Sequence, residues 1–147
     1  MTFTRFTEPP PTARIVDGQL VLMIPGRPPT PNNRFGNVYA ERSAAKRWRR
    51  TAWAIGVDAV NRSGWKAPAR ARITLTFIVP DNRPRDIDNL VASTKPLTDG
   101  LVDAKVLVGD KSTVLEWGAP RTEVIKGSAA TVYVIEVVVP PPPTLGL

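Results

Sequence analysis

Two aspartates separated by a single residue, Asp86 and Asp88, begin the segment of this sequence that is best suited to chemistry. They come shortly after an apolar run that ends at Pro80, and Asn89 follows them directly. Two carboxylates at this spacing can converge on one hard cation, and carboxylate oxygens are the ligands that Mg²⁺ and Mn²⁺ prefer. Aspartate also commonly caps helices and pairs with nearby arginines, so a capping or ion-pairing role is the alternative.

The composition restricts the chemistry further. The 147-residue chain contains no histidine and no cysteine, which excludes Ser-His-Asp and Cys-His catalysis, thiolate nucleophiles and zinc sites built on these residues. An enzyme of this composition must use carboxylates, lysine, hydroxyls or a hard metal ion. The formal net charge of +7 favours a polyanionic partner such as nucleic acid, with a basic protein that is merely soluble as the alternative.

The elements that position the first part of the chain follow from apolar periodicity. Residues 19–25 (QLVLMIP) and the alternating run 71–79 predict two strands. Between them, residues 41–62 predict a helix that Gly64 ends. The apolar stripe of this helix consists of Ala45, Trp48, Ala52, Ile55 and Ala59.

The acidic motif opens a second helical segment, residues 86–105, with Asp88 as a possible cap. We expect a break before Pro96, because proline is tolerated only in the first turn of a helix. Residues 112–117 and 130–139 predict two further strands. The resulting order β-α-β-α-β-β predicts a single α+β domain, with a mixed sheet packed by helices.

The ends of the chain are expected to lie outside this domain. Residues 1–17 predict a flexible arm, residues 18–140 the domain, and residues 141–147 a proline-rich, extended tail. No run approaches the roughly 20 apolar residues of a membrane span, and the first residues do not resemble a secretory signal. We therefore expect a cytoplasmic protein with no membrane partner.

Further motifs occur at set distances from the two aspartates. D-x-D-N-L is followed by K-P-x-x-D-G-L at 95–101 and by G-D at 109–110, and P-x-x-N-N-R at 29–34 precedes them all. Together they resemble the RusA family of Holliday junction resolvases over the region from Ile24 to about Trp117. That family consists of small, homodimeric, magnesium-dependent endonucleases, largely of phage and prophage origin, which implies a bacterial host cell for this protein.

The resemblance assigns roles to particular residues. It implies that Asp86, Asp88 and Asp110 are catalytic and bind Mg²⁺, for which Mn²⁺ substitutes, with no small-molecule cofactor. It also implies a catalytic Lys95, with Asn89 and Asp99 in supporting positions. An acid four residues after a lysine can hold that lysine in place, which is the role we expect for Asp99. Carboxylates gathered without metal should have raised pKa values, because they repel one another.

Two departures from the family pattern concern the same site. The segment between Asn89 and Lys95 is three residues longer than the best-known spacing, so Lys95 reaches the site only if the chain bends there. Where the family usually has a pair of acids, this chain has Gly109 and Asp110, which leaves the number of acids in the site open.

Basic residues around the acidic motif are expected to contact DNA phosphates, although each of them alone suits a solvated surface equally well. Phe35 is a candidate either to stack at the open centre of a junction or to anchor its own loop. Trp48 and Trp53 are expected in the core or in a dimer interface. The DNA-binding set comprises Arg27, Asn32, Asn33, Arg34, Lys46, Arg47, Arg49, Arg50, Arg83 and Arg85.

The function that these features predict is resolution of four-way DNA junctions by paired nicks, made by a homodimer during recombination and repair. Two alternatives stay open. One is a nuclease for other branched DNA, such as forks and flaps. The other is a junction-binding protein with impaired catalysis, which the absence of an acid at Gly109 favours.

Overall fold

The strand β3 (Ala71–Val79) forms the centre of a six-stranded mixed sheet in a computed structural model, which describes residues 13–29 and 38–139. The strand order is β1-β2-β6-β3-β4, and β5 also pairs with β3. Neighbouring strands from β1 to β3 are antiparallel, whereas β4 and β5 both run parallel to β3. The other strands are β1 (Ala13–Val16), β2 (Gln19–Pro25), β4 (Leu115–Trp117), β5 (Arg121–Val124) and β6 (Ala130–Val137).

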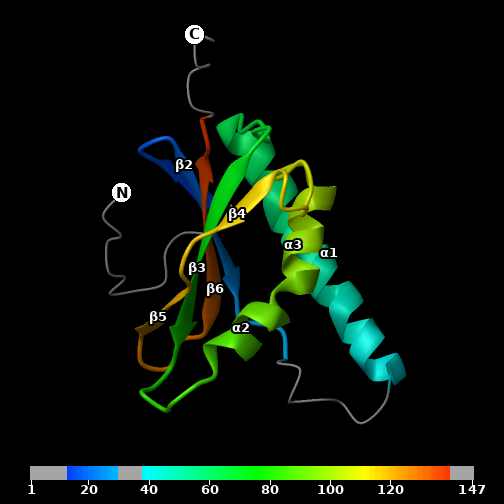
Figure 1. The fold of residues 1–147 in the computed structure, drawn as a ribbon. Coiled ribbons are helices and arrows are strands. Elements are labelled where there is room, and N and C mark those ends of the chain that lie inside the picture. The colour runs from blue at the N-terminus through cyan, green and yellow to red at the C-terminus, as the bar shows by residue number, and fades with distance from the viewer. Residues whose placement is uncertain (1–12, 30–37, 140–147) are drawn as a thin grey trace, which may run out of the picture.

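Three helices lie on one side of this sheet, as Figure 1 shows. They are α1 (Val38–Ser63), α2 (Ile87–Ser93) and α3 (Lys95–Asp103). The main core lies between the helices and the sheet, and a smaller apolar cluster lies on the other face of the sheet. The architecture confirms the predicted single α+β domain. The fully buried large side chains of the main core include Leu20, Ile24, Ile73, Phe77, Leu97, Leu101, Tyr133 and Ile135.

The long helix α1 confirms the helix predicted at 41–62 and extends it at both ends. It stops where expected, because Gly64 adopts a φ of +70° and its N–H donates to the Val60 carbonyl. The buried stripe differs in one place: Ala44 is buried and Ala45 is exposed. Ala44 is in phase with Trp48 and Ala52 at steps of four residues, which places it on the packed face.

The break in the second helical segment is confirmed. α2 ends at Ser93 and α3 begins at Lys95, with Pro96 in its first turn. The cap of α2 is Asp86 and not Asp88, since Asp86 has the extended backbone of a capping residue. No helix in residues 13–29 and 38–139 is long and apolar enough to cross a membrane.

The prediction of a flexible arm over residues 1–17 is wrong for the last residues of that range. Ala13–Val16 form β1, which pairs with β2 through a turn at Asp17 and Gly18. Both turn residues have positive φ values, 52° and 78°, as a two-residue hairpin turn requires. The domain therefore begins at or before residue 13. Residues 1–12 and 140–147, which hold the rest of the predicted arm and the predicted tail, lie outside the described residues.

Two short strands, β4 and β5, pair one after the other with the outer edge of β3. Ile73 lies opposite Trp117 and Thr76 lies opposite Arg121, so this edge has one residue more than β3 over the same stretch. Such an extra residue is a bulge, which redirects neighbouring side chains. Gly118 lies at the bulge, where an added Cβ would be 2.7 Å from the Thr74 hydroxyl. The sequence prediction missed β5 altogether.

Candidate functional site

Lys95 begins α3, and its ammonium joins two carboxylates. Nζ donates to Asp99 Oδ1 at 2.8 Å and to Asp110 Oδ2 at 2.6 Å. The hydrogen bond to Asp110 and then the one to Asp99 raise the pKa of Lys95, so the ammonium stays charged at neutral pH. Asp99 thus contacts Lys95 as the four-residue spacing predicts.

Asp110 lies between α3 and β4 and is an exposed side chain. Its hydrogen bond to Lys95, followed by the charge of that ammonium, holds the pKa of Asp110 below its ordinary value. The prediction that repulsion among carboxylates raises the pKa is therefore wrong for Asp110. The direct contact of Asp110 is with the Lys95 ammonium, which favours the ionised carboxylate.

The D-x-D-N motif forms a local cap at the start of α2. Asp86 Oδ1 accepts the backbone N–H of Asp88 at 3.0 Å and that of Asn89 at 3.4 Å. The Asn89 side-chain amide donates to Asp86 Oδ2 at 3.1 Å. Asn89 therefore fixes the orientation of Asp86, while Asp86 and Asp88 both stay exposed.

The three predicted metal ligands do not form one group. Within residues 13–29 and 38–139, no three Asp or Glu side chains lie close enough together to hold a metal ion. The donor atoms are chemically suited to Mg²⁺, but Asp110 is paired with Lys95 while Asp86 is occupied at the cap. The structure thus forms one cluster around Lys95 and Asp110 and a separate one around Asp86, and it does not join the two. Metal binding stays a prediction.

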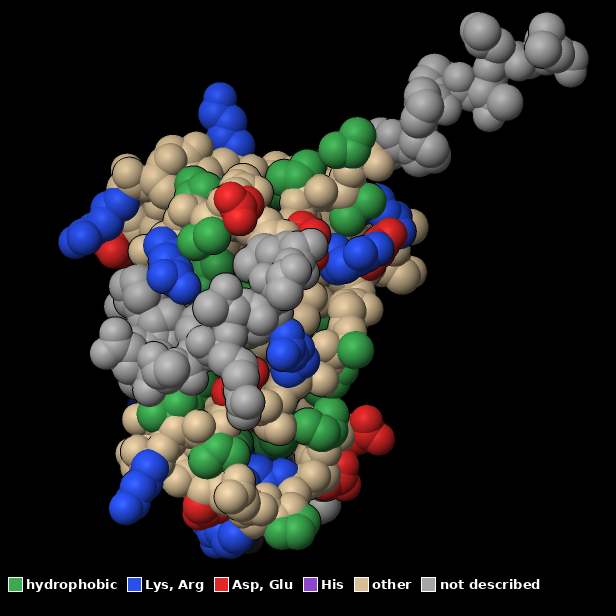
Figure 2. Space-filling view, turned by 90° about the vertical axis from the view of Figure 1, so that its left-hand side faces the viewer, with side chains coloured by type: hydrophobic (Ala, Val, Ile, Leu, Met, Phe, Trp, Pro, Cys, Tyr) green, Lys and Arg blue, Asp and Glu red, His purple; other side chains and the backbone are tan. Residues whose placement is uncertain are grey.

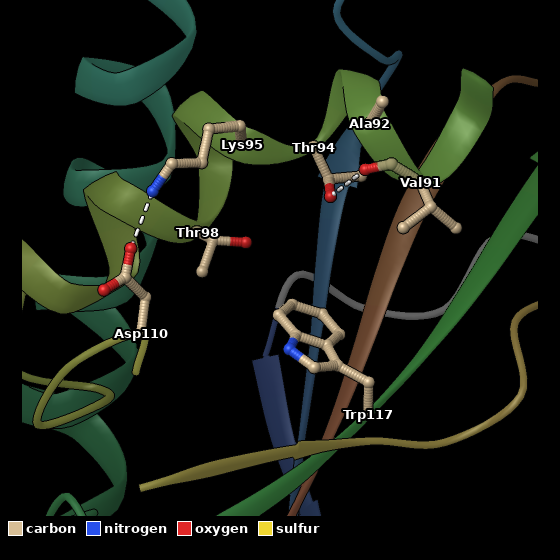
Figure 3. A pocket seen from close by; sticks show the side chains of 7 residues that line it. All are labelled: Val91, Ala92, Thr94, Lys95, Thr98, Asp110 and Trp117. Carbon is tan, nitrogen blue, oxygen red and sulfur yellow. Dashed lines mark hydrogen bonds and ion pairs between the residues drawn. The ribbon is translucent and has the colours of Figure 1, made fainter. Parts of the chain in front are cut away.

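A pocket of about 250 Å³ adjoins the Lys95–Asp110 pair (Figure 3). Its α2 wall consists of Val91 and Ala92. These residues lie three and four positions after Asp88, so Asp88 occupies the same helix face one turn away. The pocket therefore connects the face of α2 that carries Asp88 to the cluster around Lys95. The remaining lining residues are Thr94, Thr98 and Trp117.

The buried side of this pocket is held by a hydrogen bond between elements. The hydroxyls of Thr98 and Tyr133 are 2.8 Å apart, and the Tyr133 hydroxyl also donates to the Thr94 carbonyl at 3.4 Å. Tyr133 is fully buried on β6, and this burial raises the pKa of its hydroxyl. The start of α3 is therefore attached to the centre of the sheet.

Trp117 is a site residue that the sequence reasoning missed. It ends β4 and lines the pocket with 48% of its surface exposed. Leu115 and Trp117 share one face of their strand, which was visible in the alternation of residues 112–117. The pattern did not show that Leu115 is buried on this face whereas Trp117 is left exposed.

The loop after β3 contains two arginines that were expected to contact DNA. Arg83 Nε donates to both Asp81 oxygens at 3.1 Å, and Arg85 Nη2 donates to Asp81 Oδ1 at 2.7 Å. Hydrogen bonds from the Arg83 backbone, the Arg83 side chain and the Arg85 side chain lower the pKa of Asp81 to about 2. Both arginines thus stabilise the loop that leads into Asp86.

Arg27 follows β2 and lies near these two arginines. Its Nη1 atom is buried and has no hydrogen-bond partner among residues 13–29 and 38–139. Burial lowers the pKa of Arg27, and the charges of Arg85 and Arg83 lower it further. Three guanidinium groups therefore lie together beside the acidic motif, and one of them has an unused donor.

The predicted basic residues of α1 are more dispersed. Arg49 makes two hydrogen bonds to Asp103 of α3, at 2.6 and 2.9 Å, and Arg47 donates to Ser43. Lys46 and Arg50 are exposed.

On the side of the molecule away from the helices, Figure 2 shows single basic side chains with acidic ones among them, without a continuous basic band in the described part of that view.

The remaining predicted contacts have mixed outcomes. Trp48 is partly buried and packs on the main core, as expected, whereas Trp53 is 45% exposed. Asn32, Asn33, Arg34 and Phe35 lie outside the described residues.

Comparison with known proteins does not identify a family. No protein-family model and no curated protein matches the chain. A Salmonella typhimurium protein described as a translation initiation inhibitor is 12% identical over 86% of this chain and 87% of that one, with a TM-score of 0.32. A chain of a HypE–HypF complex is 16% identical over 88% of this chain and 36% of that one, with a TM-score of 0.31. Similarities at this level carry no conclusion about function.

Proposed function

We propose that this protein is a RusA-like endodeoxyribonuclease that resolves four-way DNA junctions by paired nicks. The observation that supports it best is the contact between Lys95 and Asp110. Fifteen residues separate the two in the chain, yet their side chains lie 2.6 Å apart. They belong to the set to which the family resemblance assigns catalysis, and the D-x-D-N motif lies on the helix that forms the wall beside them.

Lys95 has a definite task in this proposal. An ammonium has three N–H donors, and two of them are used by Asp99 and Asp110. The third is free for a phosphoryl oxygen, since 64% of the Lys95 side chain is exposed. A fixed, charged donor at this place stabilises negative charge that develops on the phosphate during strand cleavage.

Asp86, Asp88 and Asp110 would hold the Mg²⁺ ion that the resemblance implies. Once bound, Mg²⁺ supplies Lewis-acid activation of the phosphodiester and of an attacking water. The residues of the chain itself orient these donors: Asn89 holds Asp86, and Lys95 holds Asp110. The rest of the DNA backbone would lie across the arginines near Asp81 and across Lys46 and Arg50, which are exposed on α1.

A homodimer suits the proposed substrate. A four-way junction has two-fold symmetry and needs two nicks at related positions, which a two-fold dimer provides.

The decisive experiment uses a labelled synthetic four-way junction. We expect paired nicks by the wild-type protein with Mg²⁺, and none with a chelator or with Asp88→Asn. Binding should persist in Asp88→Asn, because the substitution removes a negative charge near the phosphates. Cleavage by Asp88→Asn at the wild-type rate would refute the metal assignment. Fork, flap and linear substrates at equal salt distinguish a resolvase from a nuclease for other branches.

A second function is favoured by one observation. The described residues hold no group of three carboxylates, which suits a junction-binding protein with impaired catalysis. Tight binding of the junction without nicks in Mg²⁺ or Mn²⁺ would support this second function over the first.

A further inference from the structure

Trp117 differs from the buried tryptophan Trp65. Trp65 is 8% exposed and its indole N–H donates to the Val106 carbonyl at 3.0 Å. Trp117 is 48% exposed, and within residues 13–29 and 38–139 its N–H has no hydrogen-bond partner. Leaving so large an apolar ring half in water forgoes a favourable burial. A ligand that covered the ring would recover it.

The pocket in front of this indole has an apolar wall and a charged end. Val91 and Ala92 form the wall, while the Lys95–Asp110 pair lies at the other end (Figure 3). Its volume of about 250 Å³ is below the roughly 300–1,000 Å³ of sites for drug-sized ligands. The space therefore suits a single flat ring system that has a negative group attached to it.

We propose that this pocket receives an unpaired nucleobase from the branch point of the DNA, stacked on Trp117. The inference rests on the proposed function, because it takes the phosphate of the same strand to lie at Lys95. Every base has a π-face, so stacking on an aromatic side chain tolerates any sequence. The positive net charge of the chain and the free N–H of Lys95 suit the attached phosphate.

This subsite makes Trp117 a specificity determinant. A base at a branch point lies where continuous stacking is interrupted and is easily unstacked, whereas a base in a linear duplex must first be pulled from its stack at a cost in free energy. Branched or single-stranded DNA therefore fills the pocket without that cost, and a linear duplex does not. The indole is 48% exposed and lines the pocket, so a base can reach it.

The test measures binding in chelator, so that no cleavage occurs. The probes are a four-way junction and the same junction with abasic nucleotides at the branch point. For the wild-type protein we expect the abasic junction to bind about five- to hundredfold more weakly, the range of one base–aromatic stack. Trp117→Ala should lose a similar factor on the intact junction and almost nothing further on the abasic one, because both changes remove the same contact.

Two further variants separate stacking from shape. Trp117→Phe keeps an aromatic face and should retain most of the affinity, whereas Trp117→Leu fills the space without such a face and should not. Trp53→Ala is the matched control, because Trp53 is 45% exposed on α1 and does not line the pocket. It should leave both affinities unchanged. Quenching of tryptophan fluorescence by oligothymidine, present in the wild type and reduced in Trp117→Phe, checks the contact directly.

Two results would overturn the inference. One is that removal of the base and Trp117→Ala each weaken the affinity by independent factors that multiply. The other is that Trp117→Leu binds as tightly as the wild type. Thermal melting of each variant identifies one that does not fold, in which case Trp117→Phe and the quenching measurement decide. The nuclease proposal is judged separately by cleavage in Mg²⁺. Binding that depends on the base without nicks leaves the subsite standing, and nicks without dependence on the base leave the nuclease standing.

Discussion

The Lys95 ammonium lies 2.6 Å from the Asp110 carboxylate and 2.8 Å from Asp99, so one cation connects α3 to the segment before β4. This arrangement fixes Lys95 without using all of its donors. It also keeps Asp110 ionised, because the ammonium lowers the pKa of that carboxyl. The two residues therefore support each other in their charged states.

Replacing Lys95 should reduce cleavage much more than stability. We expect Lys95→Met to lower the rate of junction cleavage by about 10² to 10³, the usual effect of removing one donor from developing charge. The thermal midpoint should change little, since the ion pair is exposed. Single-turnover cleavage of a labelled junction measures the rate. Lys66→Met, which removes an exposed lysine after α1, is the control and should cleave normally.

Arg27 should contribute to binding through one phosphate contact. Its Nη1, which has no partner among the described residues, lies near the charges of Arg83 and Arg85, where an anion would be favoured. In Arg27→Met, the slope of log K against log salt should fall in magnitude by about one. Binding isotherms over a series of salt concentrations give that slope. Arg62→Met removes an exposed arginine paired with Asp58, and an equal change there would contradict the assignment.

The ion pairs of Asp81 predict a dependence of stability on pH. The pKa of about 2 in the folded protein lies below the ordinary value of 3.8, so ionised Asp81 stabilises the fold above about pH 4. That contribution is lost as the pH falls toward 2. The difference in urea midpoint between the wild type and Asp81→Asn should therefore be full at pH 5 and should close near pH 2. A difference that stays constant over this range would argue against the pairing.

Gly100 allows the close approach of α1 and α3. A Cβ at this position would overlap the Arg49 carbonyl oxygen and would lie 2.8 Å from the Ala52 Cβ. We expect Gly100→Ala to destabilise the fold by about 1–3 kcal/mol, because the helices must separate. Urea unfolding measures this. Gly109→Ala is the comparison, since the nearest atom to its added Cβ, on Val114, would be 3.6 Å away. Equal losses of stability at both positions would contradict a specific role for Gly100 where α1 and α3 cross.

Apolar periodicity predicted the long elements of this fold. The stripe of α1, the alternation of β3 and the break before Pro96 all depend on residues close in sequence. The short strands β1 and β5 were missed, because four residues carry little periodic signal and their pairing is decided by the rest of the sheet. The Asp17-Gly18 turn was a usable signal for β1, since this pair favours a two-residue hairpin.

The candidate site was predictable only where the spacing is local. The contact between Lys95 and Asp99 follows from the geometry of one helix turn. The pairing of Arg83 with Asp81 was missed, because several acids and bases compete in that loop and the backbone decides among them. Trp117 was missed because its exposure depends on where the helical layer ends.

The bulge beside Gly118 has a consequence for how this protein meets other chains. It divides the outer edge of the sheet into runs of three and four residues, β4 and β5. Edges broken in this way present too few consecutive free backbone donors and acceptors to recruit a foreign strand. The protein is thereby protected along this side from edge-to-edge aggregation.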